Sequence, residues 1–275
     1  MRWKAFPHAW ESAYWDTELF RARRTPGSAL GARTSPRRRA KACPCMKPEV
    51  QECPRCAKRP ALCVCSEIQP QKTRLQVLIL QHPQEPDQEL GSARLSQLTL
   101  PQSKLLVGLS WRNLAQVLGR PAEPKRWAVL YLGSGVKGKP TGPITLTDKA
   151  GKPLPDAEES IRGLEGIIAL DGTWSQAKTL WWRNAWLLKC RRAILTPATP
   201  SQYRELRREP RRECVSTAES LAEALEGLGD SASASAELRR VFGLLLNRKR
   251  SERKNRGSAP AAVNGPSGRP SAEGS

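Results

Sequence analysis

The sequence predicts an α/β fold with a mostly parallel sheet and a small N-terminal zinc knuckle. Short apolar segments, typical of buried strands, alternate with helix-forming segments between Leu75 and Leu246. The expected strands are residues 75–80, 104–109, 127–132, 166–170 and 191–195. Four closely spaced cysteines precede the first strand and predict the knuckle.

Both ends of the chain are strongly basic. Residues 1–50 contain 11 Lys or Arg against 4 Asp or Glu, and residues 239–275 contain 9 against 2. Pro, Gly and Ser separate the Arg clusters, so we expect a basic, disordered arm over 1–49 and a basic, disordered tail over 248–275. Such ends attract polyanions, most commonly nucleic acid, or they are simply solvated. An alternative start of translation at Met46 would remove most of the arm.

The composition argues against a membrane protein and against a secreted one. No run of 18 apolar residues exists, and the first residues lack the apolar core of a signal peptide. Eight cysteines without a secretory signal favour a reducing, cytoplasmic setting. A basic arm is also compatible with a nuclear or organellar address. Nothing in the sequence indicates a protein partner.

The cysteine cluster lies within residues 50–70 and has the spacing C-x2-C-x6-C-x-C. Its expected metal ligands are Cys53, Cys56, Cys63 and Cys65. Four thiolates can close a tetrahedral site, for which Zn²⁺ is the default metal. Free thiols or disulfides are the alternative. Cys43 and Cys45 could substitute as ligands or be incidental, and we favour the second interpretation. The knuckle is also basic, which suits contact with RNA, and its cations are Arg55, Lys58 and Arg59.

Two strands in the first half of the domain lead into residues suited to a ligand. The first strand ends at His82-Pro-Gln-Glu85, although a lone His is more often structural than catalytic. The third ends at Gly133-Ser-Gly135, where the backbone can approach a ligand or simply turn. The helices expected between these strands are 89–98 and 113–118. Residues 136–162 are polar and rich in Gly and Pro, which predicts a long loop or small hairpin that acts as a lid or substrate guide.

The chain is organised around the strand 166–170, which stops at Asp171 and is followed by an expected helix over 175–188. Thr173 precedes Gln176 by three residues, the spacing of a capping box. Asp171 therefore lies at the carboxyl end of a strand, where open α/β sheets bind ligands, and its position in the turn should expose it. Helical spacing predicts core packing from Trp181 onward for the stripe Trp174, Ala177, Trp181, Ala185 and Leu188.

The C-terminal part carries a second charged segment. Residues 201–212 combine Tyr203 with five Arg, which suits RNA binding or a solvated charged face. Ser216 and Glu219 have capping-box spacing and indicate the start of a helix. The last two helices are expected at 217–228 and 236–246.

Several of these segments, in this order, resemble the DTW-domain family of tRNA-uridine aminocarboxypropyltransferases. The matching motifs are His82-Pro-x-Glu85, Asp171-x-Thr-Trp174, Tyr203 with its Arg cluster and Ser216-Thr217-x-Glu219. The resemblance covers Cys53 to Leu246 and implies a catalytic domain over 71–247 that is related to the knotted SPOUT methyltransferases. It also implies transfer of the 3-amino-3-carboxypropyl group from S-adenosylmethionine to N3 of a tRNA uridine, leaving methylthioadenosine.

The same resemblance implies the site residues. The catalytic residues would be Asp171, Thr173 and Trp174. The donor would be bound by Asp171, Gly172, Gly133, Gly135, Ser216 and Thr217. The RNA substrate would be bound by His82, Tyr203, Arg207, Arg208 and Glu213.

For Asp171 we hypothesise that it is the general base for uridine N3 or the group that orients the donor's ammonium. The ring of Trp174 would lie against the sulfonium or the adenine. The donor's carboxylate would suit the amides at the start of the following helix, or Arg207 or Arg208. Two other functions stay open: a SPOUT-type RNA methyltransferase and a non-catalytic, zinc-containing RNA-binding protein.

Overall fold

The computed structural model describes residues 51–86, 88–132, 143–148, 151–196, 200–203, 206 and 215–257. All of them belong to one compact unit of the chain. Several predictions lie outside these residues: the basic arm, the tail beyond 257, Gly133, Gly135, Arg207, Arg208 and Glu213.

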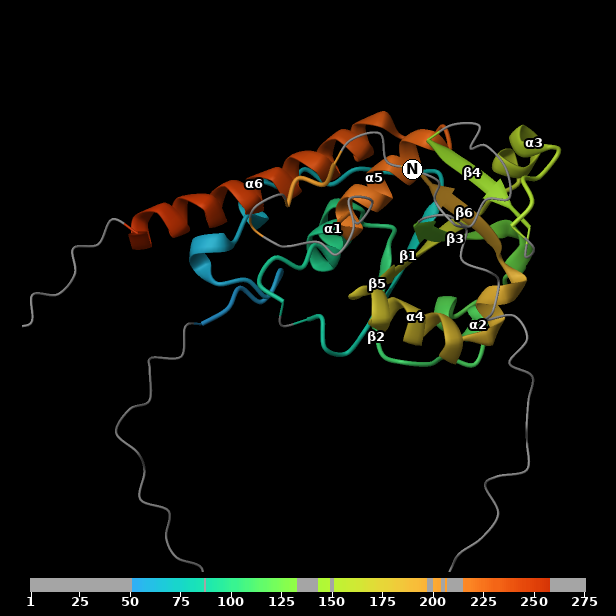
Figure 1. Cartoon of the computed structure of the whole chain (residues 1–275), viewed down its shortest axis with the longest axis horizontal. Helices are drawn as coiled ribbons and strands as arrows, with labels where there is room; N and C mark the ends of the chain where they lie inside the picture. Colours follow the sequence, from blue (N-terminus) through green and yellow to red (C-terminus); the bar gives the residue numbers. More distant parts are fainter. Residues whose placement is uncertain are drawn as a thin grey trace, which may run out of the picture. The chain divides into compact units, whose positions relative to one another are not determined.

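A single six-stranded sheet with the order β2-β1-β5-β3-β6-β4 forms the centre of the described part (Figure 1). The strands are β1 (Gln76–Gln81), β2 (Lys104–Val107), β3 (Trp127–Leu132), β4 (Ile144–Thr147), β5 (Gly166–Asp171) and β6 (Arg191–Leu195). Every neighbouring pair is parallel except β4 with β6. The predicted α/β fold with a mostly parallel sheet is therefore confirmed.

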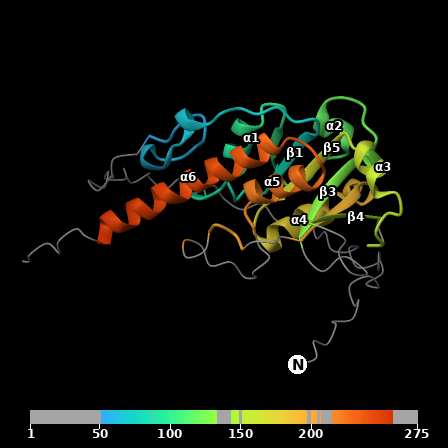
Figure 2. The same ribbon diagram turned by 90° about the horizontal axis from the view of Figure 1, so that it is seen from above.

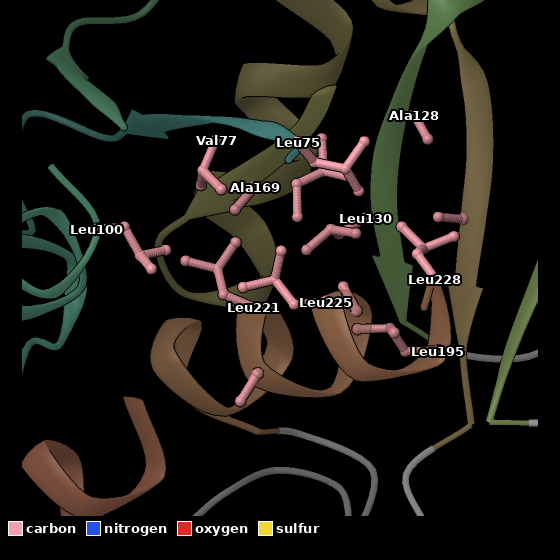
Figure 3. Packing of buried hydrophobic residues seen from close by; sticks show 14 of the residues in the cluster. Leu75, Val77, Leu100, Ala128, Leu130, Ala169, Leu195, Leu221, Leu225 and Leu228 are labelled. Atoms are coloured by element: carbon pink, nitrogen blue, oxygen red, sulfur yellow. The ribbon is translucent and has the colours of Figure 1, made fainter. Parts of the chain in front are cut away.

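Helices cover both faces of this sheet (Figures 1 and 2). They are α1 (Ala93–Thr99), α2 (Leu114–Leu118), α3 (Ala157–Arg162), α4 (Trp174–Arg183), α5 (Thr217–Gly227) and α6 (Ala232–Gly257), with short 3-10 helices η1 (Pro60–Leu62), η2 (Cys65–Glu67), η3 (Pro124–Arg126) and η4 (Ala185–Lys189). In β1 the side chains alternate, so Val77 and Ile79 pack toward α1, α5 and α6. Figure 3 shows Val77 on the side of the sheet that carries Leu221 and Leu225 of α5. Leu78 and Leu80 pack on the other face with α2 and η4. No helix in the described ranges is long and apolar enough to cross a membrane.

Gly166 explains the close packing at the start of the central strand β5. A Cβ atom at this position would lie 2.5 Å from the carbonyl oxygen of Gln76 and 2.5 Å from the ring of Trp127. The missing side chain therefore lets the fully buried indole of Trp127 lie across β5 while β1 and β3 pair with it.

The segment 136–162 was expected to be a loop or small hairpin, and its described part contains more structure than that. Ile144–Thr147 forms the antiparallel edge strand β4 on β6, and α3 follows. Thr147 also bridges Pro153, which is a local hairpin. A four-residue strand whose partner is β6, far along the chain, leaves no local signal in the sequence.

The predicted core stripe after Trp174 is only partly correct. Helix α4 ends at Arg183 rather than at Leu188, and the change to the 3-10 helix η4 shifts the phase of the following side chains. Ala177 and Trp181 are half-buried. Ala185 and Leu188 are exposed, which contradicts the predicted core packing. The residues that enter the core instead are Trp186 and Leu187.

The last helix is longer than predicted. It was expected at 236–246, yet α6 runs through the basic residues to Gly257, so the prediction of a disordered tail is wrong for 248–257. Ion pairs hold this end against the cysteine loop: Arg248 with Glu67, and Arg59 with Glu252. Glu89, in the segment between β1 and α1, pairs with both Lys249 and Arg59. The loop and this end of α6 lie side by side in both views (Figures 1 and 2).

Candidate active site at the carboxyl ends of β1 and β5

The candidate site begins where the two central strands end. Gln81 and Asp171 are the last residues of β1 and β5 and pair with each other in register. The chain of β1 continues to His82, whose backbone N–H donates to the carbonyl oxygen of Asp171 at 2.9 Å. The chain of β5 turns directly into α4. This edge is the place where parallel α/β sheets bind ligands.

Asp171 is buried, with only 6% of its surface exposed, so the expectation that its turn exposes it is wrong. The amide Nε2 of Gln81 donates to its Oδ2 at 2.7 Å, and the hydroxyl of Thr217 donates to its Oδ1. Both carboxylate oxygens therefore have a partner from a distant part of the chain. Two donors fix the plane of the carboxylate, as a positioned acid or base requires.

The start of α4 is held by the predicted capping box. The backbone N–H of Thr173 donates to Gln176 Oε1 at 2.6 Å, and Thr173 accepts from the backbone of Gln176 in return. Gln176 Nε2 also donates to Gln84 Oε1 at 3.2 Å, which ties α4 to the turn after β1. A Cβ at Gly172 would lie 2.8 Å from Gln176 Cβ, so this turn needs glycine. Trp174, the first residue of α4, is 48% exposed beside the site.

Helix α5 contributes through its own capping box. The backbone N–H of Ser216 donates to Glu219 Oε2 at 2.8 Å, and that of Glu219 donates to Ser216 Oγ at 3.2 Å. Ser216 is thus occupied with capping, whereas the next residue, Thr217, reaches Asp171. The predicted box is confirmed, and it explains how Thr217 comes to face β5.

The four cysteines of the loop before β1 gather into one cluster. Their sulfur atoms all lie within 4.8 Å of one another, with Cys53 and Cys65 at 3.9 Å and Cys56 and Cys63 at 3.7 Å. A tetrahedral metal with bonds of about 2.3 Å to sulfur needs sulfur atoms about 3.8 Å apart. All four thiols are free, so the disulfide alternative is not supported. Backbone N–H groups of Cys56 and Arg55 lower the pKa of Cys53 to about 6, which favours its thiolate, whereas burial raises the pKa of Cys56 to about 11 and also that of Cys65.

Lys58 connects the cysteine loop with the site. It follows Cys56 by two residues, is 4% exposed, and donates from Nζ to the carbonyl oxygen of Gln88 at 2.7 Å. Burial lowers the pKa of Lys58, and the nearby charges of Cys56 and Asp171 oppose that shift. A buried ammonium therefore lies within electrostatic reach of the Asp171 carboxylate.

Comparison with known proteins identifies the family. Residues 50–250 match the family model of the DTW domain, which is more than half of the chain. The chain belongs to the DTW-domain family. Proteins named tRNA-uridine aminocarboxypropyltransferase 2 from Macaca fascicularis, Mus musculus and Drosophila melanogaster are 30%, 29% and 28% identical to it over 180, 180 and 181 residues.

These matches cover 63% of this chain. They cover 55% of the macaque and mouse proteins and 65% of the fly protein, so the chain spans a little over half of the length of the mammalian relatives. No solved structure matches the chain.

The DTW domain brings together only some of the residues that the sequence predicted for the site. Asp171, Gly172, Thr173, Trp174 and Thr217 surround the same strand end. His82 lies beside them, half-buried, and its Nδ1 accepts from the backbone N–H of Gln84 at 3.3 Å.

Tyr203, by contrast, is a core residue of this DTW domain. Only 3% of its surface is exposed, its ring packs edge-on against Phe242 with centroids 5.0 Å apart, and its hydroxyl donates to the carbonyl oxygen of Leu90 at 3.1 Å. Stacking on an RNA base, as predicted, would require this ring to leave the core. Trp174, beside the site at the start of α4, is an exposed aromatic.

Three polar residues of the DTW domain were not predicted as site residues. Gln81 precedes the His82 motif, Glu85 is its last residue, and Lys58 lies inside the cysteine cluster. A polar Gln at the end of an otherwise apolar strand was a usable signal for Gln81. The matching motif His82-Pro-x-Glu85 was a usable signal for Glu85, whereas the burial of Lys58 left none, because Lys58 sits in a segment that looks like an ordinary polar loop.

Proposed function

We propose that this protein transfers the 3-amino-3-carboxypropyl group of S-adenosylmethionine to N3 of a uridine in tRNA. The observation that carries the proposal is the doubly held Asp171 carboxylate at the end of β5, within the DTW motif. The names of the relatives support the same reaction.

Each of the site residues would have a separate role in such a transfer. Uridine N3 carries a proton and is a poor nucleophile, so a carboxylate that accepts this proton activates it. Asp171 would take the proton, while Gln81 and Thr217 hold its carboxylate in place. The new bond joins N3 to the γ-carbon of the donor, the bond from that carbon to sulfur breaks, and its electron pair stays on sulfur. The sulfonium thereby becomes the neutral thioether of methylthioadenosine.

The site fits a cationic donor. Gln81 Oε1 is a buried acceptor that has no hydrogen-bond partner among the described residues. The exposed indole of Trp174 lies at the start of α4, and a cation against an indole face contributes roughly 0.5 to 2 kcal/mol. Both features are unfavourable for a purely structural end of a sheet.

We also propose that the cysteine cluster holds Zn²⁺. The sulfur separations of 3.7 and 3.9 Å suit a tetrahedral four-thiolate site, and the thiolate donor set favours zinc. The metal would fold the loop that carries Lys58 and Arg59 and so support both the site and α6. Its role is structural, because four protein ligands leave no open position.

A basic surface supports tRNA as the substrate. Arg55 of the cysteine loop and Arg253 of α6 are exposed, and the two elements are joined by the ion pairs of Arg59 with Glu252 and of Arg248 with Glu67. Cations on such a surface would contact the phosphates of tRNA, so the affinity for tRNA should fall steeply as the salt concentration rises. The predicted relation to knotted SPOUT methyltransferases and the cytoplasmic location stay predictions.

The deciding experiment incubates the purified chain with unmodified tRNA and S-adenosylmethionine and identifies both products by mass spectrometry. Aminocarboxypropyl-uridine together with methylthioadenosine is the expected result. A methylated nucleoside with S-adenosylhomocysteine would move the chemistry to a methyltransferase. Binding of tRNA without any product, using several tRNAs, would favour a non-catalytic RNA-binding protein.

A further inference from the structure

Helix α4 presents two tryptophans and a lysine to solvent. Trp174, Lys178 and Trp182 follow one another at four-residue spacing, which places them on one side of the helix with about 12 Å along its axis from first to last. Trp174 is 48% exposed and Trp182 is 56% exposed, and Lys178 between them is exposed as well. The solvent side of a surface helix is normally polar, so two exposed indoles on it indicate a binding surface.

The chain around this side of α4 is basic and contains no acidic residue. Residues 172–203 include five Lys or Arg and no Asp or Glu. Three of these cations are exposed on α4 and η4, namely Lys178, Arg183 and Lys189. No carboxylate of their own segment can neutralise them. Cations interleaved with aromatic rings are typical of surfaces that bind single-stranded nucleic acid, because the cations contact phosphates and the rings stack on bases.

Helix α4 is held in place along its length. The capping box fixes its first turn. Trp181 packs against the core, with the guanidinium carbon of Arg192 5.4 Å from the centroid of its ring. Asn184 fixes the end of the helix by donating to the carbonyl oxygen of Leu109 at 3.0 Å. Trp182 therefore lies on a rigid element, which reduces the entropy that is lost when a ligand stacks on its ring.

The exposed side of α4 begins at the candidate active site. Trp174 follows Asp171 by three residues, and Lys178 and Trp182 lie about 6 and 12 Å further along the helix axis. N3 of uridine lies on the edge that pairs with adenine, so a uridine that reacts at N3 is unpaired. Its neighbours in an RNA loop are then also able to stack their bases on aromatic side chains.

We propose that this side of α4 binds the unpaired nucleotides next to the target uridine, an inference that rests on the proposed transferase function. Trp182 stacks on a base, and Lys178 pairs with a phosphate of the same strand. Helix α6, which carries the exposed Arg253, packs on the opposite face of the sheet (Figure 1). The two basic surfaces therefore contact different parts of the RNA.

A second copy of the chain fits this side of α4 less well than RNA does. A two-fold contact through α4 would set the same surface of both copies face to face. Lys178, Arg183 and Lys189 of one copy would then meet the same cations of the other, and residues 172–203 offer no acid to pair with them. The charge of the surface favours a polyanion.

The test measures the affinity for two labelled RNAs by fluorescence anisotropy: single-stranded oligouridylate and a blunt duplex of equal length. Trp182→Leu keeps an apolar side chain but removes the aromatic ring. We expect it to weaken binding of oligouridylate by roughly 5- to 100-fold and to leave binding of the duplex, whose bases are covered, within about twofold. Trp182→Phe retains a ring and should lose much less affinity for oligouridylate.

The salt dependence separates the role of the ring from that of the cation. Lys178→Ala removes one phosphate contact, so the slope of log affinity for oligouridylate against log salt concentration should fall by about 0.7. Trp182→Leu should lower the affinity without changing this slope. Lys125→Ala is the matched control and should change neither quantity, because Lys125 is exposed before the amino end of β3, at the opposite edge of the sheet from Asp171.

Two results would overturn the assignment of this surface. One is unchanged affinity for oligouridylate in both Trp182→Leu and Lys178→Ala. The other is a dimer that Trp182→Leu converts to a monomer in analytical ultracentrifugation, which would assign the surface to a second copy of the chain. Circular dichroism reports folding, and if Trp182→Leu does not fold, Lys178→Ala at its exposed position decides the outcome.

Formation of product by the wild type reports on the proposed function separately. If the wild type forms aminocarboxypropyl-uridine while neither variant loses affinity for oligouridylate, the transferase function stands and only the surface on α4 is wrong. If the wild type forms no product from any tRNA while both variants lose affinity, α4 binds RNA and the transferase function is wrong.

Discussion

The side chains of Gln81 and Asp171, the last residues of two paired strands, are joined by a hydrogen bond of 2.7 Å from Nε2 to Oδ2. The bond links residues that are 90 positions apart in the chain. Thr217 completes the arrangement from the start of α5. The carboxylate is thus held by the sheet on one side and by a helix on the other, which gives it one orientation.

Replacing Asp171 by Asn should abolish transfer while preserving the fold. The amide oxygen can still accept from Thr217, and Gln81 can turn its own amide so that the free Oε1 accepts from the new NH2 group. We expect transfer to fall by roughly 10²- to 10⁴-fold, as for loss of a general base. Single-turnover assays with tRNA measure the loss, and Asp156→Asn, at an exposed position outside the site, is the matched control. Full activity in Asp171→Asn would show that Asp171 is not the base.

Thr217 should act on the reaction only through Asp171. Thr217→Val removes the hydroxyl that donates to Oδ1 but keeps the shape of the side chain. We expect about a tenfold loss of kcat, little change in KM, and a shifted pH profile, because the carboxylate loses one of its two donors. Thr217→Ser keeps the donor and should restore activity. If Ser and Val variants behaved alike, the hydroxyl would have no positioning role.

The turn between β5 and α4 should not tolerate a side chain at Gly172. A Cβ there would lie 2.8 Å from Gln176 Cβ and 3.4 Å from His82 Cβ, so Ala would push away the residue that closes the capping box. Loss of a cap costs about 0.5–2 kcal/mol, and we expect at least that drop in the free energy of unfolding, with weaker donor binding. Urea unfolding measures it. Gly163→Ala, where the nearest atom is 3.4 Å away, is the control and should be nearly neutral.

Local signals in the sequence predicted the elements but not the way they meet. The apolar strand ending at Asp171 and the Thr173–Gln176 capping box depend on neighbouring residues, and both are confirmed. The burial of Asp171 depends on Thr217, 46 residues away, so no spacing could reveal it. The same holds for Lys58, whose burial follows from packing of the cysteine loop on the domain.

The ends of helices α4 and α6 were predicted wrongly, because they too depend on contacts with distant parts of the chain. The apolar period after Trp181 continues smoothly in the sequence, although the backbone changes from α to 3-10 at Asn184. Asn184 is fully buried and donates to the carbonyl oxygens of Leu109 and Leu180, contacts that stop α4 there. Helix α6 is longer than predicted, because ion pairs to the cysteine loop stabilise residues whose composition is typical of a disordered tail.

Removing the metal should unfold the cysteine loop and loosen the site behind it. Cys56→Ser takes away one ligand, and we expect loss of bound zinc and a lower Tm, because the metal would hold the loop that carries Lys58 on the domain. Elemental analysis and thermal unfolding measure these two effects. Cys190→Ser is the matched control: Cys190 is equally buried but outside the cluster, and burial raises the pKa of its thiol to about 12. Equal metal content in both variants would contradict the cluster assignment.

The junction between the cysteine loop and α6 should show a defined pH dependence. Hydrogen bonds from Arg59 and then Lys249 lower the pKa of Glu252 to about 2. A carboxylate whose pKa is lowered in the folded state adds stability that is fully present above its ordinary value near 4.5 and is lost as the pH falls through about 2. Glu252→Gln should therefore be less stable than the wild type by roughly 0.2–1 kcal/mol at pH 7, because the ion pairs are partly exposed.

That difference should stay constant from pH 7 to about 5 and shrink between about 4.5 and 2. Metal release in acid affects both chains, so the readout is the difference between their unfolding free energies at each pH. Glu226→Gln, which removes a more exposed partner of Arg239, is the control and should cost less. A difference between Glu252→Gln and the wild type that persisted unchanged down to pH 2 would show that the charge of Glu252 does not hold α6 on the loop.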